Sequence, residues 1–291
     1  MNEKVRKIYH SLGADLICTV KNIASPLDDT SDMHNHTCHE ILIINKGSLN
    51  LFTDHSGVEM SHGDVALIPM YAFHRGELLT PGTYDRIVIN VSENIIADAS
   101  TKHCNLNNCF KPYNDKIIHT IHLDDDELNE ITHYSELLQD NLFGKTPESE
   151  ILCDIYLKLI LIMLNKKYRR NDIALSQDKM PDIVKRTFTY IDEHLAEEIS
   201  LKSLEKEIHN NGTYISRCVK KISGLTISQY IINKRIALAC KLLREGNTAS
   251  EACFQSGFNN YSNFCRTFTK QVGVSPKHFQ MAYRRGVITN V

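Results

Sequence analysis

Three histidines and one glutamate near the start of this 291-residue sequence are the residues best suited to chemistry. His34, His36 and Glu40 lie within one short segment, and His74 follows on a later one. Imidazole nitrogens and carboxylate oxygens are ligands that Zn, Fe, Mn and Ni accept in proteins. Paired strands that brought the four side chains together would create a site for a divalent ion. The other interpretation is a metal-free pocket in which His36, Glu40 and His74 bind a small organic molecule.

A second group of polar side chains lies in the last 110 residues, where the sequence repeats itself. An offset of 49 residues places Arg217 on Arg266 and Lys221 on Lys270. Apolar, hydroxyl and glycine positions recur at the same offset: Thr213 on Ser262, Ile215 on Phe264, Val219 on Phe268, Gly224 on Gly273, Thr226 on Ser275 and Tyr230 on Phe279. A repeat of this length predicts two copies of one small helical unit.

Each copy predicts a short helix that begins after an asparagine cap, Asn211 or Asn260, and stops at a glycine. Apolar residues four apart turn one side of each helix inward. The residues left on the outer faces are Thr213, Ser216, Arg217 and Lys220 in the first copy, and Tyr261, Ser262, Asn263 and Arg266 in the second. Arginine can bind guanine and asparagine can bind adenine through two hydrogen bonds in the major groove. These faces therefore predict readout of duplex DNA.

Short apolar segments separated by turn residues precede this repeat, from about residue 15 to residue 90. The clearest are 40–44, 48–52 and 65–68. Such spacing predicts a barrel or sandwich of antiparallel strands without helices. Because side chains alternate along a strand, His39 is predicted to face away from Glu40, on the surface.

Two amphipathic helices are predicted after the strands, followed by a linker. In 124–142 the apolar positions are Leu128, Ile131, Tyr134, Leu137, Leu138 and Leu142; in 148–167 they are Ile151, Ile155, Leu159 and Ile162. The second helix carries more apolar surface than one intramolecular contact requires, so pairing of two subunits through 124–168 and simple packing on the strands both stay open. Residues 171–181 are polar and end in proline, which is typical of a linker.

The charge of the chain is divided unevenly between its two parts. Residues 182–291 carry 16 Lys and Arg against 9 Asp and Glu, a balance of +7, whereas the preceding residues carry 17 against 26, a balance of -9. A basic part joined to an acidic one indicates that only the second part faces a polyanion. The nine cysteines are scattered without a CxxC pair, which favours reduced thiols and a cytoplasmic protein. No stretch is apolar and long enough to predict a membrane span or a secretory leader.

At the repeat, the sequence resembles the AraC/XylS family of bacterial regulators, over about 105 residues. The family signature G-F-x5-F-x3-F-x4-G-x-S-P stands here as Gly257-Phe258, Phe264, Phe268, Gly273 and Ser275-Pro276. Before it come 217–224 and 230–235, followed by Ala239 and Leu242-Leu243. The chain departs from the family at Glu205, where alanine is usual, and at Val219, which replaces phenylalanine; both positions bear on the packing of the first unit.

The resemblance implies two helix-turn-helix units bridged by a long helix at about 227–244, with supporting helices at 201–208 and 248–255. Carried over position by position, it implies base and phosphate contacts at Thr213, Ser216, Arg217, Tyr261, Ser262, Asn263 and Arg266, and phosphate contacts at Lys220, Lys221 and Lys270. The segment around His34, His36 and Glu40, with Gly63, Pro69 and His74, resembles the two spacing motifs of cupin barrels, apart from Tyr71 at a usual glycine. AraC-type sensor domains resemble cupins and mostly bind organic effectors without metal.

Together these observations predict an α+β chain of two domains. Residues 1–122 form a cupin-like antiparallel β-barrel, 123–170 a helical pair, 171–181 a linker, and 182–291 an all-α DNA-binding domain. The predicted function is a transcription regulator, not an enzyme, that binds duplex DNA and a small-molecule effector, forms a homodimer and contacts RNA polymerase if it activates. No cofactor is required by this prediction. The alternative is a metal-dependent cupin enzyme or a metal-sensing regulator that uses His34, His36, Glu40 and His74.

Overall fold

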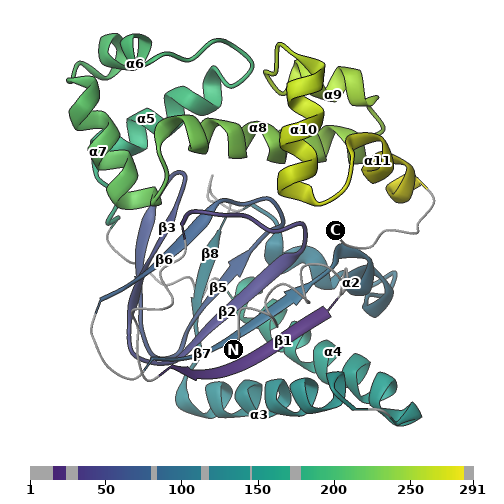
Figure 1. Ribbon diagram of the computed structural model, residues 1–291. Coiled ribbons are helices and arrows are strands. Elements are labelled where there is room, and N and C mark those ends of the chain that lie inside the picture. The colour runs from purple at the N-terminus through teal and green to yellow at the C-terminus, as the bar shows by residue number, and fades with distance from the viewer. Residues whose placement is uncertain are drawn as a thin grey trace.

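The computed structural model describes residues 16–23, 32–79, 84–112, 118–144, 146–170 and 178–284. The first part is built mainly from strands (Figure 1). These strands are β1 (Leu16–Ile23), β2 (His39–Lys46), β3 (Leu49–Thr53), β4 (Gly57–Met60), β5 (Asp64–Ile68), β6 (His74–Leu78), β7 (Tyr84–Val91) and β8 (His119–His122). Between β7 and β8 lie the helix α2 (Glu93–Ala99) and the 3-10 helix η2 (Leu106–Phe110).

The described strands form two antiparallel sheets, one of five strands in the order β1-β7-β2-β5-β8 and one of three in the order β4-β3-β6. The prediction of antiparallel strands is confirmed, but that of a closed barrel is wrong for these strands. Strand pairing ends at β1 and β8 in one sheet and at β4 and β6 in the other, so side chains join the two layers instead. Leu42, Ile44, Leu51 and Met60 are among those that fill the space between the sheets.

Helix α3 (Asp125–Leu142) packs on β1 of the five-stranded sheet, and α4 (Pro147–Arg169) packs on α3 and η2; both helices lie below the sheet in Figure 1. The two predicted helices are therefore confirmed. On α4, Leu157, Ile160, Leu161 and Leu164 are buried, whereas Ile151, Ile155 and Ile162 are exposed. Both sides of this helix are apolar, so its periodicity alone does not select the buried one.

The last part of the described chain is entirely helical. Its elements are α5 (Asp182–Glu193), α6 (Leu201–Ile208), α7 (Gly212–Ser223), α8 (Ile227–Arg244), α9 (Ala249–Gln255), α10 (Tyr261–Val272) and α11 (Pro276–Arg284). Figure 1 shows α8 as a bridge between a first unit, α5 to α7, and a second unit, α9 to α11. Each unit has its own apolar core, which α8 completes. None of the described helices combines the length and hydrophobicity needed to span a bilayer.

The core of the first helical unit is shared with the β-rich part. Met33, Phe52 and Phe73 are buried in the same cluster as Phe188, Val219 and other residues of α5 to α8. The end of the predicted linker is also attached to the β-rich part, because the Gly57 N–H donates to Asp178 at 2.9 Å and the Lys179 N–H donates to the Gly57 carbonyl at 2.7 Å. Residues 171–177 of that linker lie outside the described residues.

Candidate nucleic-acid interface and histidine cluster

Helix α7 presents the first of the two predicted polar faces. It begins after Asn211, whose side chain accepts the Thr213 N–H at 2.9 Å, as an N-cap does. It ends at Gly224, whose φ of 76° is the left-handed conformation that glycine adopts without strain. Thr213, Arg217, Lys220 and Lys221 are exposed, and Ser216 is half-buried. The predicted residues therefore lie on the outer side, while Ile215 and Val219 are fully buried.

Helix α10 repeats this design in the second unit. The Asn260 side chain accepts the Asn263 N–H at 2.8 Å, and the helix stops at Gly273, with a φ of 87°. Phe264 and Phe268 are fully buried. The residues that remain exposed are Tyr261, Ser262, Asn263, Arg266 and Lys270. Each unit therefore offers a hydroxyl, an arginine and a lysine to solvent from one helix, and both helices pack against α8.

One of the two departures in the first unit, Glu205, has a clear structural consequence. Glu205, on α6, accepts the Gly212 N–H at 2.6 Å, so its carboxylate satisfies a free donor at the N-terminus of α7. A negative charge there is also stabilised by the helix dipole. Gly212 suits this position because an added Cβ would lie 2.8 Å from the Glu205 carboxylate and 2.6 Å from Leu201. Glu205 thus binds the two helices of the unit together.

The histidines and the glutamate singled out in the sequence lie together in the β-rich part. The His36 Nε2 atom is 2.8 Å from the Glu40 Oε2 atom, and the His74 Nε2 atom is 3.7 Å from the same oxygen. The His34 ring centroid lies 4.5 Å from that of His74 and 4.9 Å from that of His36. One ligand nitrogen from each of the three histidines lies within 4.8 Å of the others. We call His34, His36, Glu40 and His74 the histidine cluster.

Burial and neighbouring charge act in opposite directions on these groups. Burial, assisted by His74 and His36, lowers the pKa of His34 to about 3. Burial also lowers the pKa of His74, but the Glu40 carboxylate outweighs it and the net pKa lies above its usual value. For Glu40, burial raises the pKa, and the contacts with His36 and His74 reverse this and hold it well below its usual value. The cluster therefore keeps the Glu40 carboxylate ionised beside a neutral His34, and it favours the protonated form of His74.

His39, predicted to lie on the surface, is buried and lies outside this cluster. Its ring stacks on Phe110 with 4.3 Å between centroids. Strand alternation does turn it away from Glu40, but η2 and the segment around it cover that face of the sheet. A shallow surface hollow of about 310 Å³ lies between α5 and α6, not at the histidine cluster. It is lined by Asp182, Lys185, Arg186, Thr189, Tyr190, Glu193, Glu207 and Ile208.

Comparison with known proteins bears on the helical part of the chain. Residues 204–282 match a family described as a helix-turn-helix domain. This segment is an AraC-type helix-turn-helix domain. It spans α6 to α11, except for the ends, and contains both capped helices.

The relatives that match the AraC-type domain carry names of transcription regulators. The chain is 33% identical over 95 residues to the uncharacterized HTH-type transcriptional regulator YobQ of Bacillus subtilis, covering 32% of this chain and 39% of that protein. It is 32% identical over 108 residues to the bifunctional transcriptional activator/DNA repair enzyme AdaA of the same organism, covering 36% of this chain and 51% of AdaA. The match thus spans about half or less of the length of these relatives.

A solved structure of ToxT from Vibrio cholerae, bound to an unsaturated fatty acid, aligns with nearly the whole chain. The alignment covers 95% of this chain and 96% of ToxT, with 16% sequence identity and a TM-score of 0.39.

The structure adds residues around the AraC-type domain that the sequence patterns do not reveal. Arg75, the residue after His74, donates through Nη1 to the Lys221 carbonyl at 2.8 Å and to the Ile222 carbonyl at 2.6 Å. The Met33 N–H donates to the Ser223 carbonyl at 2.7 Å. These contacts join segments 145 or more residues apart, so no local spacing signals them.

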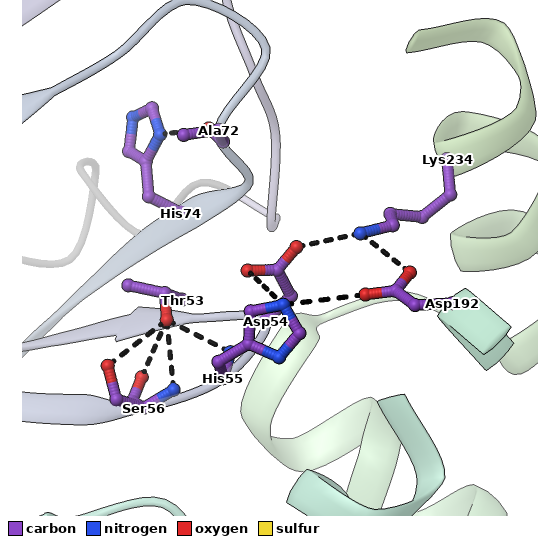
Figure 2. Close-up of polar contacts among 8 residues, drawn as sticks. All are labelled: Thr53, Asp54, His55, Ser56, Ala72, His74, Asp192 and Lys234. Atoms are coloured by element: carbon purple, nitrogen blue, oxygen red, sulfur yellow. Dashed lines mark hydrogen bonds and ion pairs between the residues drawn. The ribbon is translucent and has the colours of Figure 1, made fainter. Parts of the chain in front are cut away.

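A second missed group lies where the β3–β4 turn faces α5 and α8. Figure 2 shows Lys234 between two carboxylates, with Nζ 2.7 Å from Asp54 and 2.7 Å from Asp192. His55 lies 3.8 Å from Asp54 and 3.6 Å from Asp192. Asp54 belongs to the β-rich part, whereas Asp192 and Lys234 belong to the helical part. This ion-pair group therefore joins the β-rich part to the helical part.

Proposed function

We propose that this chain is a sequence-specific DNA-binding transcription regulator in which α7 and α10 read bases and the β-rich part senses a small molecule. The observation that carries the proposal is the pair of capped helices within the AraC-type domain, each with an exposed arginine on its polar face. Helices of this composition fit the major groove, where arginine recognises guanine. We assign base contacts to Thr213, Ser216, Arg217, Tyr261, Ser262, Asn263 and Arg266, and phosphate contacts to Lys220, Lys221 and Lys270.

Selection of duplexes from a random library, followed by fluorescence anisotropy, tests this proposal. We expect one enriched sequence with two half-sites, because the chain carries two reading helices. The Arg266→Ala and Arg217→Ala variants should each lose about 1–3 kcal/mol of binding free energy and accept other bases at one position. Lys102→Ala, which removes an exposed positive charge from the β-rich part, is the matched control and should bind as the parent protein does. Equal enrichment of all sequences would contradict the proposal.

The cupin-enzyme alternative has less support, since the relatives that match the helical part are named as transcription regulators, with AdaA named as a DNA repair enzyme as well. We keep residues 1–122 as the sensing domain, 123–170 as its helical pair and 182–291 as the DNA-binding domain. The small-molecule effector, sensed through His36, Glu40 and His74, is part of the proposal, as are a cytoplasmic location and contact with RNA polymerase if the protein activates.

We also propose that two copies pair through α4. Ile151, Ile155 and Ile162 are exposed and lie within about 40° of one another around the helix, because residues four and eleven apart share a face. Phe143 is exposed just before this helix begins. Light scattering after size-exclusion chromatography should give a dimer that Ile151→Glu and Ile155→Glu convert to a monomer. A monomeric parent protein would contradict the pairing without affecting the assignment of DNA contacts.

A further inference from the structure

We propose that the histidine cluster binds a divalent first-row transition ion, with Zn²⁺ as the reference case, and that binding acts on α7 through Met33 and Arg75. This inference rests on the proposed function, but it takes the sensed species at these residues to be a metal ion, as in the metal-sensing alternative, and it names the route of regulation. The cluster offers three imidazole nitrogens and one carboxylate oxygen, a donor set that such ions accept. Glu40 and His74 are buried and His34 and His36 half-buried, so the site is shielded from bulk water.

The hydrogen bonds of two rings leave the right nitrogen for a metal. The His34 Nδ1 atom is 2.8 Å from the Asp32 carbonyl, and the His74 Nδ1 atom is 3.0 Å from the Ala72 carbonyl. A carbonyl can only accept, so both Nδ1 atoms carry the proton and both Nε2 atoms keep a lone pair when neutral. Metal-binding histidines are held in this way by their other nitrogen. The His74 Nε2 atom is buried without a hydrogen bond and lies 3.7 Å from the Glu40 Oε2 atom.

The second acidic group in the described residues does not compete for this role. Asp54, His55 and Asp192 also come within ligand range of one another. The Lys234 ammonium, however, lies 2.7 Å from both carboxylates and supplies the positive charge there. An added cation at that place would be repelled by Lys234. The histidine cluster contains no lysine or arginine among its four members, so a metal ion would compete only with protons on its imidazoles.

The segments that carry the ligands also hold the end of α7. His34 and His74 pair through their backbones, with N–H to carbonyl distances of 3.0 and 2.9 Å. Met33, the residue before His34, donates to the Ser223 carbonyl. Arg75, the residue after His74, donates to the carbonyls of Lys221 and Ile222. The last four carbonyls of a helix have no partner within it. Three of those in α7 are therefore satisfied from either side of the histidine cluster.

A bound ion would change the spacing of these segments. The three nitrogens lie within 4.8 Å of one another, whereas ligands about 2.05 Å from a tetrahedral zinc are roughly 3.3 Å apart. The ligands would approach one another by up to about 1.5 Å on this geometry. His34 directly follows Met33, and His74 directly precedes Arg75. Because Met33 and Arg75 contact the end of α7, a displacement of the two histidines is separated from the first DNA-reading helix by only one residue of chain.

Metal binding is tested first, without DNA, on the full chain freed of metal by a chelator. Calorimetric titration with Zn²⁺ should give one ion per chain, and Co²⁺ should give the visible absorption of a tetrahedral site. His36→Gln alters a half-buried ligand and should weaken Zn²⁺ binding at least tenfold, whereas the matched His62→Gln, at an exposed turn, should leave it unchanged. Absence of stoichiometric binding, or equal binding by His36→Gln, would overturn the metal site.

The route to α7 is tested by hydrogen–deuterium exchange of residues 212–224 with and without Zn²⁺. We expect a change in the exchange of the parent protein and a loss of that change in Arg75→Met, which should still bind Zn²⁺. Lys179→Met is the matched control, because Lys179 pairs with Glu59 and does not contact α7 in the described structure. Unaltered exchange of 212–224 in the zinc-bound parent protein would overturn the coupling.

DNA binding is measured last, as anisotropy on the selected duplex. Zn²⁺ should change the dissociation constant by about fivefold or more, the usual lower range of coupling between sites. Failure to bind any duplex, with or without Zn²⁺, would contradict the proposed function while the titration and the exchange still decide the metal site and its route. Equal DNA affinity with and without Zn²⁺ would overturn regulation by the ion.

Discussion

Replacement of Lys234 by methionine tests whether the ion-pair group joins the two parts of the chain. Its side chain is 14% exposed, and its two carboxylate partners are 9% and 23% exposed, at Asp54 and Asp192. Removing one partner of a buried charge pair costs about 3–5 kcal/mol, because the other charge stays buried without compensation. Burial lowers the pKa of Lys234, but Asp54 and Asp192 outweigh it and the net pKa is raised, so the ammonium is charged at neutral pH.

The expected cost lies at the low end of that range, about 3 kcal/mol, because one carboxylate can take up a proton. Burial and the neighbouring Asp54 raise the pKa of Asp192 even though Lys234 opposes this. A carboxyl group whose pKa is higher in the folded state stabilises the fold increasingly as the pH falls. The deficit of Lys234→Met should therefore be larger at pH 7 than near pH 5.

Urea unfolding followed by circular dichroism measures these differences. Asp192→Asn is the matched variant, since it leaves the Asp54–Lys234 ion pair and removes the repulsion between the two carboxylates. We expect it to stay within about 1 kcal/mol of the parent protein. A Lys234→Met variant as stable as the parent, or an Asp192→Asn variant as unstable as Lys234→Met, would refute the reasoning.

Three further predictions concern single positions. Glu205→Ala should lower the free energy of unfolding by about 1 kcal/mol, because the Gly212 N–H loses its acceptor, and Glu205→Gln by less; thermal unfolding of both variants checks this. Gly224→Ala should cost clearly more than Gly246→Ala in the same assay: both have positive φ, but an added Cβ meets Asp32 only at position 224 and finds nothing within 4 Å at 246. Burial raises the pKa of Asp178, but hydrogen bonds from Gly57, Met180 and Lys185 leave it below 3.8, so the advantage of the parent protein over Asp178→Asn should be complete at pH 6 and shrink below about pH 4. An unchanged advantage at pH 3 would contradict this last prediction.

The helical part could be predicted well because its signals are local. Asn211 and Asn260 cap helices within three residues, and Gly224 and Gly273 end them where predicted. The bounds of 201–208 and 227–244 match α6 and α8. The spacing of His34, His36 and Glu40 also indicated that these side chains lie together, because they are close in the sequence. In the structure His74 joins them, since its backbone pairs with that of His34.

The remaining features depend on contacts between distant segments. His39 alternates correctly along β2 but is buried by η2, which lies about 70 residues later in the chain. The buried face of α4 is decided by α3 and η2, against which it packs, since both faces are apolar. Whether the sheets are open or closed depends on which strand edges pair. The alternation of apolar and polar residues along the strands is the same in both cases, so it does not distinguish an open sheet from a closed barrel. Arg75 and Lys234 show no pattern at all, because Arg75 contacts residues more than 140 positions away and Lys234 is paired with Asp54, 180 positions away.

The contacts at the end of α7 have an evolutionary consequence. Arg75 and Met33 donate to main-chain carbonyls, which every residue type possesses. Mutations that replace the outward side chains of this helix would therefore leave the hydrogen bonds at its C-terminus intact. A lineage could therefore exchange the exposed residues of α7 while the attachment of this helix to the β-rich part was inherited unchanged.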